Sequence, residues 1–384
     1  MMLKIILYAY SSQIYFCRQI AKAVRRDITF MWLAGMQQSK IKTILRKETH
    51  MKRVFYLIID QLAGHWEESV KIEGTDLPPA NVKGYHEKGL IPNFSYLIDN
   101  GLWVKRPWNN QRCKTIAGLK YLATGSYSRE ETLYNSSSRW FLEAEKEMGF
   151  FEFAKRYYLD KITVITTGNP FCRGYFYVPE LMQRIPAYYH NMAPSFRDEA
   201  VLRKLVFPWM EHFSDTWALA HAYLSGMDAV TYCPSYTEAP CGRDGSKHTY
   251  MLFLDGLIEE VIRFLKTKGW WEETYIVIAS DHGYHLGCTA SADMGVKTNN
   301  WCCDHAEPWD CEVWDFEKGR STGIPSNGCK RITFILSGGA LEAKYRGKTI
   351  EEAEIIDVIP TIAELLDVPY ECQGKSILHK QLED

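Results

Sequence analysis

The sequence contains no long apolar run. None of its hydrophobic stretches approaches the ~18–20 residues that a membrane-spanning helix needs. The first residues, MMLKIILYAYSSQIYFCRQIAKAVRRD, join a short apolar patch to a basic stretch and lack a small-residue cleavage site. We therefore expect a cytoplasmic protein that is neither secreted nor inserted in a membrane.

An excess of charge of one sign is also missing. The 45 Lys and Arg residues nearly balance the 47 Asp and Glu residues, which gives a formal net charge of −2. Such a balance excludes a surface that binds polyanions over the whole protein. We expect a small-molecule partner, no nucleic acid and no membrane, and the sequence leaves the oligomeric state open.

The cysteines do not form a paired pattern. There are eleven of them, an odd number, scattered along the chain. This is typical of buried thiols in a reducing compartment rather than of a disulfide framework. One cluster could hold zinc, although it lacks the two separated cysteine pairs of a structural site. It consists of Cys302, Cys303, Asp304, His305 and Cys311.

Alternating strands and helices are what the chain does contain. Strands are predicted within 54–59, 161–168, 274–279 and 331–339, helices within 250–269 and 357–368, and either one within 216–228. The run VFYLII is apolar throughout, as in a strand that is buried on both faces. We predict an α/β fold with a mostly parallel central sheet and helices on both faces. Stretches near 126–215 and 286–328 show no clear period, and we interpret them as insertions that form a lid.

Polar side chains follow three of these segments. Asp60 ends the first strand, Asp228 ends the 216–228 segment, and Asp281 with His282 ends the strand IVIAS. Carboxylates and an imidazole at one edge of a sheet would repel each other unless a divalent cation lay between them, so we predict zinc, with manganese or magnesium as substitutes. The alternatives are that Asp60 and Asp281 cap local turns and that His282 lies at the surface.

Residues 51–384 resemble the alkaline phosphatase superfamily, which includes type I phosphodiesterases, nucleotide pyrophosphatases, sulfatases and phosphoethanolamine transferases. The resemblance rests on segments in a shared order: VFYLIIDQ, IPNFSYLIDNGLW, KTIAGLKYLATGSY, TYIVIASDHGYHLG, ITFILSGG and IIDVIPTIAELLDVP. It implies a nucleophile at Thr115. A threonine cannot become the formylglycine that sulfatases use, and Cys113 is two residues out of register. The alternative is that Thr115 only caps the helix that follows.

The resemblance also implies metal ligands. The first site of the phosphodiesterases would use Asp60, Thr115, Asp281 and His282. The second site would use Asp228 together with two histidines, but Tyr232 stands where the first of these histidines is expected.

No histidine lies near RITFILSGG for the final ligand, so His285, His305 or neither fills that place. With one metal, positive charge for the substrate oxygens would come from Lys297, His285 or His305. The resemblance therefore implies a metal-dependent hydrolase of phosphate esters, of diesters more than monoesters. The alternatives are a catalytically impaired binding protein and a one-metal, sulfatase-like hydrolase or transferase.

The first fifty residues differ from the rest. Residues 5–35, within ILYAYSSQIYFCRQIAKAVRRDITFMWLAG, resemble a fragment of a bacterial insertion-sequence transposase of the DDE type. Such a piece is too short to hold a catalytic domain, so transposition is not expected. We predict that residues 1–50 are not an independent domain and that Met51 is the natural start, which mass spectrometry of the native N-terminus checks.

Overall fold

The computed structural model describes residues 52–127, 149–158, 162–167, 183–185, 194–231, 241, 245–301 and 304–383. The chain divides after Met51, into Met1–Met51 and Lys52–Asp384. The first of these units lies outside the described residues, so the fold given below is that of the second.

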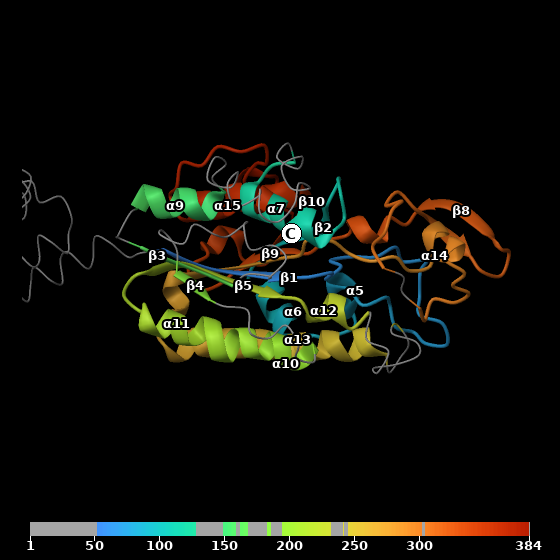
Figure 1. Ribbon diagram of the computed structural model, residues 1–384, viewed down its shortest axis with the longest axis horizontal. Helices are drawn as coiled ribbons and strands as arrows, with labels where there is room; N and C mark the ends of the chain where they lie inside the picture. The colour runs from blue at the N-terminus through green and yellow to red at the C-terminus, as the bar shows by residue number, and fades with distance from the viewer. Residues whose placement is uncertain are drawn as a thin grey trace, which may run out of the picture. The chain divides into compact units, whose positions relative to one another are not determined.

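A mixed sheet forms the centre of this unit (Figure 1). In spatial order its strands are β10 (Lys348–Glu354), β2 (Leu102–Trp108), β9 (Phe334–Ser337), β6 (Thr274–Ala279), β1 (Arg53–Ile59), β5 (Trp217–Leu224), β3 (Thr163–Thr167) and β4 (Gln183–Ile185). Among these strands only β9 runs against the rest, pairing antiparallel with both β2 and β6. The predicted α/β fold with a mostly parallel sheet is confirmed.

Helices cover both faces of the sheet, which explains why every residue of β1 is buried. One face carries α7 (Thr115–Thr124), α9 (Phe150–Tyr158) and α15 (Val358–Leu365), and the other carries α6 (Pro92–Asp99), α10 (Pro194–Ala200), α11 (Phe207–His212) and α13 (Ser246–Thr267) (Figure 1). The side chain of Tyr56 in β1 reaches the first of these layers and donates a hydrogen bond to the carbonyl of Leu122 in α7, 3.1 Å away.

Short elements complete the unit. They are α5 (Val82–Glu87), the π-helix η5 (Val201–Val206), α12 (Gly226–Ala229), α14 (Thr289–Asp293), the hairpin strands β7 (Glu312–Asp315) and β8 (Arg320–Pro325), and the 3₁₀ turns η6 (Trp271–Glu273), η7 (Gly328–Lys330), η8 (Ala343–Tyr345), η9 (Ile355–Asp357) and η10 (Ile377–His379). Among the residues that the structure describes, no helix has both the length and the apolar character to cross a bilayer.

Two sequence interpretations change. The segment 216–228, left open between helix and strand, is the strand β5 followed by α12. The described part of 126–215 supplies α9, β3, β4, α10 and α11 to the sheet and its covering layers. Those residues are therefore part of the sheet and its covering layers, and the side chains of Phe150, Ile165 and Met210 among them are fully buried.

Candidate active site

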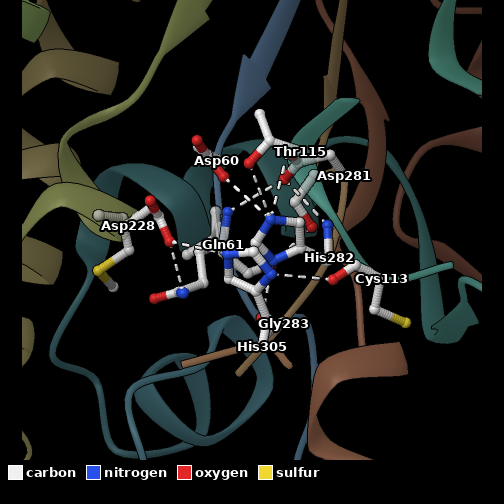
Figure 2. Close-up of polar contacts among 12 residues, drawn as sticks. Asp60, Gln61, Cys113, Thr115, Asp228, Asp281, His282, Gly283 and His305 are labelled. Carbon is white, nitrogen blue, oxygen red and sulfur yellow. Dashed lines mark hydrogen bonds and ion pairs between the residues drawn. The ribbon is translucent and has the colours of Figure 1, made fainter. Parts of the chain in front are cut away.

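The predicted site residues meet where β1, β5 and β6 end (Figure 2). Asp60 follows β1, Asp228 lies in α12 just after β5, and Asp281 with His282 follows β6. Because these three strands are parallel neighbours, their carboxyl ends lie at the same edge of the sheet, where ligands of open α/β sheets bind. Thr115, the first residue of α7, faces them from the covering layer.

One group contains Asp60, Asp281 and His282, whose ligand atoms all lie within 4.8 Å of one another. The Nε2 atom of His282 is 3.3 Å from Oδ1 of Asp60 and 3.7 Å from Oδ2 of Asp281. The Oγ1 atom of Thr115 is 3.2 Å from the same ring nitrogen. The structure thus places the four residues predicted for the first metal within reach of one ion.

The tautomer of His282 follows from its other ring nitrogen. Nδ1 lies 2.9 Å from the carbonyl oxygen of Gly283, and since a carbonyl can only accept, Nδ1 carries the proton. In the neutral ring Nε2 is then an acceptor, directed at two carboxylates. Metal-binding histidines are commonly oriented in this way, by a hydrogen bond from the nitrogen that does not bind the metal.

Burial makes this arrangement costly without a cation. Burial raises the pKa of Asp281 to about 7 and, together with the charge of Asp281, raises that of Asp60 well above its usual range. It lowers the pKa of His282 to about 4, so the ring is neutral. Oδ1 of Asp60 and Oδ2 of Asp281 are buried without a hydrogen bond among the described residues. Three acceptors that face one another in a buried space fit a divalent cation.

A second group contains Asp228, His282 and His305. Nε2 of His305 lies 3.8 Å from Oδ1 of Asp228, and its ring is 4.1 Å from the His282 ring. Nδ1 of His305 donates to the carbonyl of Cys113 at 3.1 Å, which leaves Nε2 as an acceptor (Figure 2). Asp228 and His305 keep 19% and 17% of their side-chain exposure, so this group opens toward solvent whereas the first is buried.

The structure places the two candidate histidines, His285 and His305, differently. His305 enters the site, and His285 is bound elsewhere, to the carbonyl of Ala306. Tyr232, which stands in place of a family histidine, lies outside the described residues. The five-residue zinc cluster proposed from the sequence is not gathered: Cys311 lies beside His285, His305 faces Asp228, and Cys302 and Cys303 lie outside the described residues.

The capping alternative holds in part for Asp281, whose Oδ1 accepts from the backbone N–H of His282 at 2.9 Å, but not for Thr115 or Asp60. Lys114, not Thr115, occupies the N-cap position of α7, and the Thr115 side chain is directed at His282 instead of at a backbone N–H. Asp60 accepts a hydrogen bond from the hydroxyl of Tyr223. His282 is fully buried rather than at the surface.

Two residues escaped the sequence analysis. Gln61 has a φ of 61°, so its amide turns back and donates to Asp228 at 2.6 Å, while its backbone N–H donates to Asp281 at 3.1 Å. Lys247, fully buried in α13, donates to Oε1 of Gln61 and to the carbonyl of Met227. It supplies a positive charge near Asp228, whereas Lys297 makes no hydrogen bond or ion pair with the site among the described residues. The only sequence signal was the place of Gln61 directly after Asp60.

Close packing holds α7 against the loop that carries Asp281. A Cβ atom at Gly118 would lie 2.6 Å from both the Cβ and the carbonyl oxygen of Asp281. We expect Gly118→Ala to push Thr115 away from His282 and to lower turnover ~10- to 100-fold, since small misplacements of reacting groups cost this much. Steady-state kinetics at saturating metal measures it.

The matched control is Gly256→Ala in α13, where an added Cβ meets nothing within 4 Å. This variant should keep wild-type turnover and gain up to ~1 kcal/mol of stability from helix propensity. Equal kinetics for the two variants would show that the contact between α7 and Asp281 does not position Thr115.

Comparison with known proteins agrees with this geometry. The sulfatase family model matches residues 92–368, and a transposase domain model matches residues 1–49. Murine ectonucleotide pyrophosphatase/phosphodiesterase 5, solved as an inactive form with AMP, has a TM-score of 0.53 at 14% identity, covering 85% of this chain and 98% of that one. A phosphonate monoester hydrolase from Silicibacter pomeroyi gives 0.51 at 12% identity, over 85% and 76% of the two chains. A sulfatase from Pseudoalteromonas sp. gives 0.53 at 15%, over 88% and 75%. At these identities the structural likeness shows the fold alone, whereas the family match over residues 92–368 confirms the predicted resemblance to the alkaline phosphatase superfamily.

Proposed function

This chain belongs to the sulfatase family of the alkaline phosphatase superfamily, and we propose that within it the protein hydrolyses phosphate esters, preferentially diesters, with Thr115 as nucleophile. The observation that carries the proposal is the position of the Thr115 hydroxyl, 3.2 Å from the ring nitrogen that Asp60 and Asp281 also face. The hydroxyl is therefore held where its charge can be stabilised as it attacks phosphorus.

The proposed metal is zinc, with manganese or magnesium as substitutes. Asp60, Thr115, Asp281 and His282 would hold one ion, and Asp228 and His305 would hold a second. A divalent metal held by these residues would lower the pKa of the threonine hydroxyl and would neutralise oxygens of the substrate. The mixed oxygen and nitrogen ligands fit zinc, and the buried unpartnered carboxylate oxygens give the site its negative charge.

The protein's own groups then account for attack and orientation. Thr115 Oγ forms a bond to phosphorus, the alcohol of the ester leaves, and water later hydrolyses the phospho-threonine. The first backbone N–H groups of α7 have no helical partner and suit the negative oxygens of phosphate. Lys247 donates to Oε1 of Gln61, and the side-chain amide of Gln61 donates to Oδ1 of Asp228, the oxygen that also faces His305, so the two residues fix the orientation of this carboxylate.

Two observations favour phosphate over sulfate esters. Threonine at position 115 cannot be converted to formylglycine. The thiol of Cys113 is buried and lies 3.4 Å from the carbonyl oxygen of Gln111.

The test is a panel of three nitrophenyl substrates: a phosphodiester, a phosphomonoester and a sulfate monoester. The full-length protein is first stripped of metal and then given zinc. We expect zinc-dependent turnover with the diester fastest and the sulfate ester slowest. Faster turnover of the sulfate ester would overturn the phosphate assignment. Zinc binding without turnover of any substrate would point to a binding protein of the same fold.

Protons and metal should compete for this site. The pKa of Asp281 is about 7, and those of Asp60 and Asp228 lie well above their usual range, each raised chiefly by burial. At pH 6 zinc must displace the proton of Asp281, which is largely absent at pH 8, and this displacement weakens binding by about tenfold per pH unit below the pKa. We therefore expect zinc to raise the melting temperature more at pH 8 than at pH 6, measured by thermal unfolding with and without chelator.

The variant Asp281→Asn, measured at both pH values, gives the change in melting temperature that zinc causes by binding elsewhere on the chain. This change is subtracted from that of the wild type. An equal or larger shift at pH 6, after this subtraction, would contradict a site built from buried carboxylates.

A further inference from the structure

A second cluster of potential ligands lies outside the active site. His285, Cys288 and Cys311 place their ligand atoms within 4.8 Å of one another, and all three side chains are buried, with exposures of 0%, 0% and 2%. Both thiols are free cysteines. His285 and Cys288 belong to the loop that follows β6, and Cys311 directly precedes β7.

The distances match those of a zinc ion shared by the three side chains. Nδ1 of His285 lies 3.5 Å from the sulfur of Cys288 and 3.8 Å from the sulfur of Cys311. Tetrahedral zinc, with its usual bonds to nitrogen and sulfur, sets these atoms about 3.6 Å apart. A disulfide would leave the imidazole without a role in the cluster.

The orientation of His285 provides independent support. Its Nε2 atom lies 2.7 Å from the carbonyl oxygen of Ala306, which can only accept, so Nε2 carries the proton. In the neutral ring Nδ1 is then an acceptor directed at the two sulfurs. A backbone carbonyl that orients the imidazole in this way is a common outer partner of zinc-binding histidines.

Charge balance allows such an ion to be buried. Two thiolates neutralise the charge of Zn²⁺, and neutral histidine adds none. The hydroxyl of Ser291 lies 3.4 Å from the Cys288 sulfur, and a fourth ligand would complete the tetrahedron.

We propose that His285, Cys288 and Cys311 bind a structural zinc ion, distinct from the metals of the active site. The ion joins the loop after β6 to the segment before β7. In the sequence, His305 lies between the ligands Cys288 and Cys311. The carbonyl of its neighbour Asp304 accepts a hydrogen bond from the backbone N–H of His285, at 3.2 Å. The zinc thereby holds in place the segment that carries His305 to the active site.

Cobalt substitution tests this proposal on the full-length, reduced protein. Cobalt bound to thiolates shows an intense charge-transfer absorption in the near ultraviolet, and the oxygen and nitrogen ligands of the active site produce none. We expect this absorption in the cobalt-substituted wild type. Cys288→Ser and Cys311→Ser should each lose the absorption and should each bind one equivalent of zinc per chain less than the wild type. Asp281→Asn should keep it, which separates this site from the active site. The matched control Cys241→Ser, another buried cysteine, should also keep it.

Three results would overturn the proposal. They are the absence of thiolate-to-cobalt absorption in the wild type, its persistence when both cysteines are replaced, and a disulfide between Cys288 and Cys311 in a peptide map of the native protein. Should the serine variants fail to fold, alkylation of the wild type decides: zinc should slow modification of Cys288 and Cys311 at least ~10-fold relative to chelated protein, and equal rates would refute the site.

Discussion

Replacing Thr115 with valine is expected to lower turnover of a phosphodiester at least ~1,000-fold, a loss of about 4 kcal/mol of transition-state stabilisation. Valine keeps the shape and β-branching of threonine at the first position of α7 but removes the hydroxyl that lies 3.2 Å from Nε2 of His282. Because Lys114 occupies the N-cap position, the helix loses no capping hydrogen bond. The melting temperature should therefore stay near that of the wild type, and kinetics with thermal unfolding measure both.

Thr115→Ser is the conservative variant, since it keeps a hydroxyl at the same position. Turnover within about tenfold of the wild type is expected for it. Thr124→Val is the matched control in the same helix, because the hydroxyl of Thr124 bonds only to backbone carbonyls, that of Lys120 at 2.9 Å among them. A covalent phosphate on residue 115, detected by mass spectrometry after acid quench, supports the nucleophile. If Thr115→Val turned over the phosphodiester as fast as the wild type, Thr115 would not be the nucleophile.

The sequence could predict the positions of the strand-end ligands because sheet geometry is simple. Parallel strands start from one edge and end at the other, so a polar residue after each buried apolar run must lie at the same edge. Asp60, Asp281 and His282 follow this rule closely. The apolar run before Asp60 also predicted that the first strand is buried on both faces.

The remaining ligands depend on loops, whose paths have no periodic signal. His305 reaches Asp228 from a segment with little regular structure, and its orientation depends on the backbone carbonyl of Cys113. Gln61 contacts Asp228 only because its backbone adopts a left-handed conformation, which is uncommon for glutamine. Lys247 is placed by the packing of α13, and a lysine in an amphipathic helix is usually exposed.

The cysteines show the same limit. The sequence drew attention to neighbours along the chain, near Cys302 and Cys311, because zinc motifs are usually identified by local spacing. In the structure Cys311 instead meets His285 and Cys288, which come from a separate loop. Long-range pairing of this kind depends on how the chain folds back, which spacing alone does not encode.

Asp281→Asn is expected to separate activity from stability. One carboxylate oxygen of Asp281 accepts from the backbone N–H groups of Gln61 and His282, at 3.1 and 2.9 Å, and asparagine keeps both hydrogen bonds. The other oxygen, buried without a hydrogen bond, becomes an amide nitrogen, which does not bind zinc. We expect loss of active-site zinc and a decrease in turnover of ~1,000-fold or more.

The stability of the metal-free variant should change in the opposite direction. The folded pKa of Asp281 is about 7, above its unfolded value of 3.8, so its contribution is fully present below pH 3.8 and is lost as the pH rises through 7. Removing this ionisation should leave the metal-free variant more stable than the metal-free wild type at pH 8, as thermal unfolding in chelator would show. The control is Asp255→Asn in α13, whose Oδ1 accepts from the first N–H groups of α6, away from the active site; it should keep wild-type turnover. A metal-free Asp281→Asn protein less stable than the wild type at pH 8 would mean that the carboxylate stabilises the fold, and the case for a cation between Asp60 and Asp281 would fail with it.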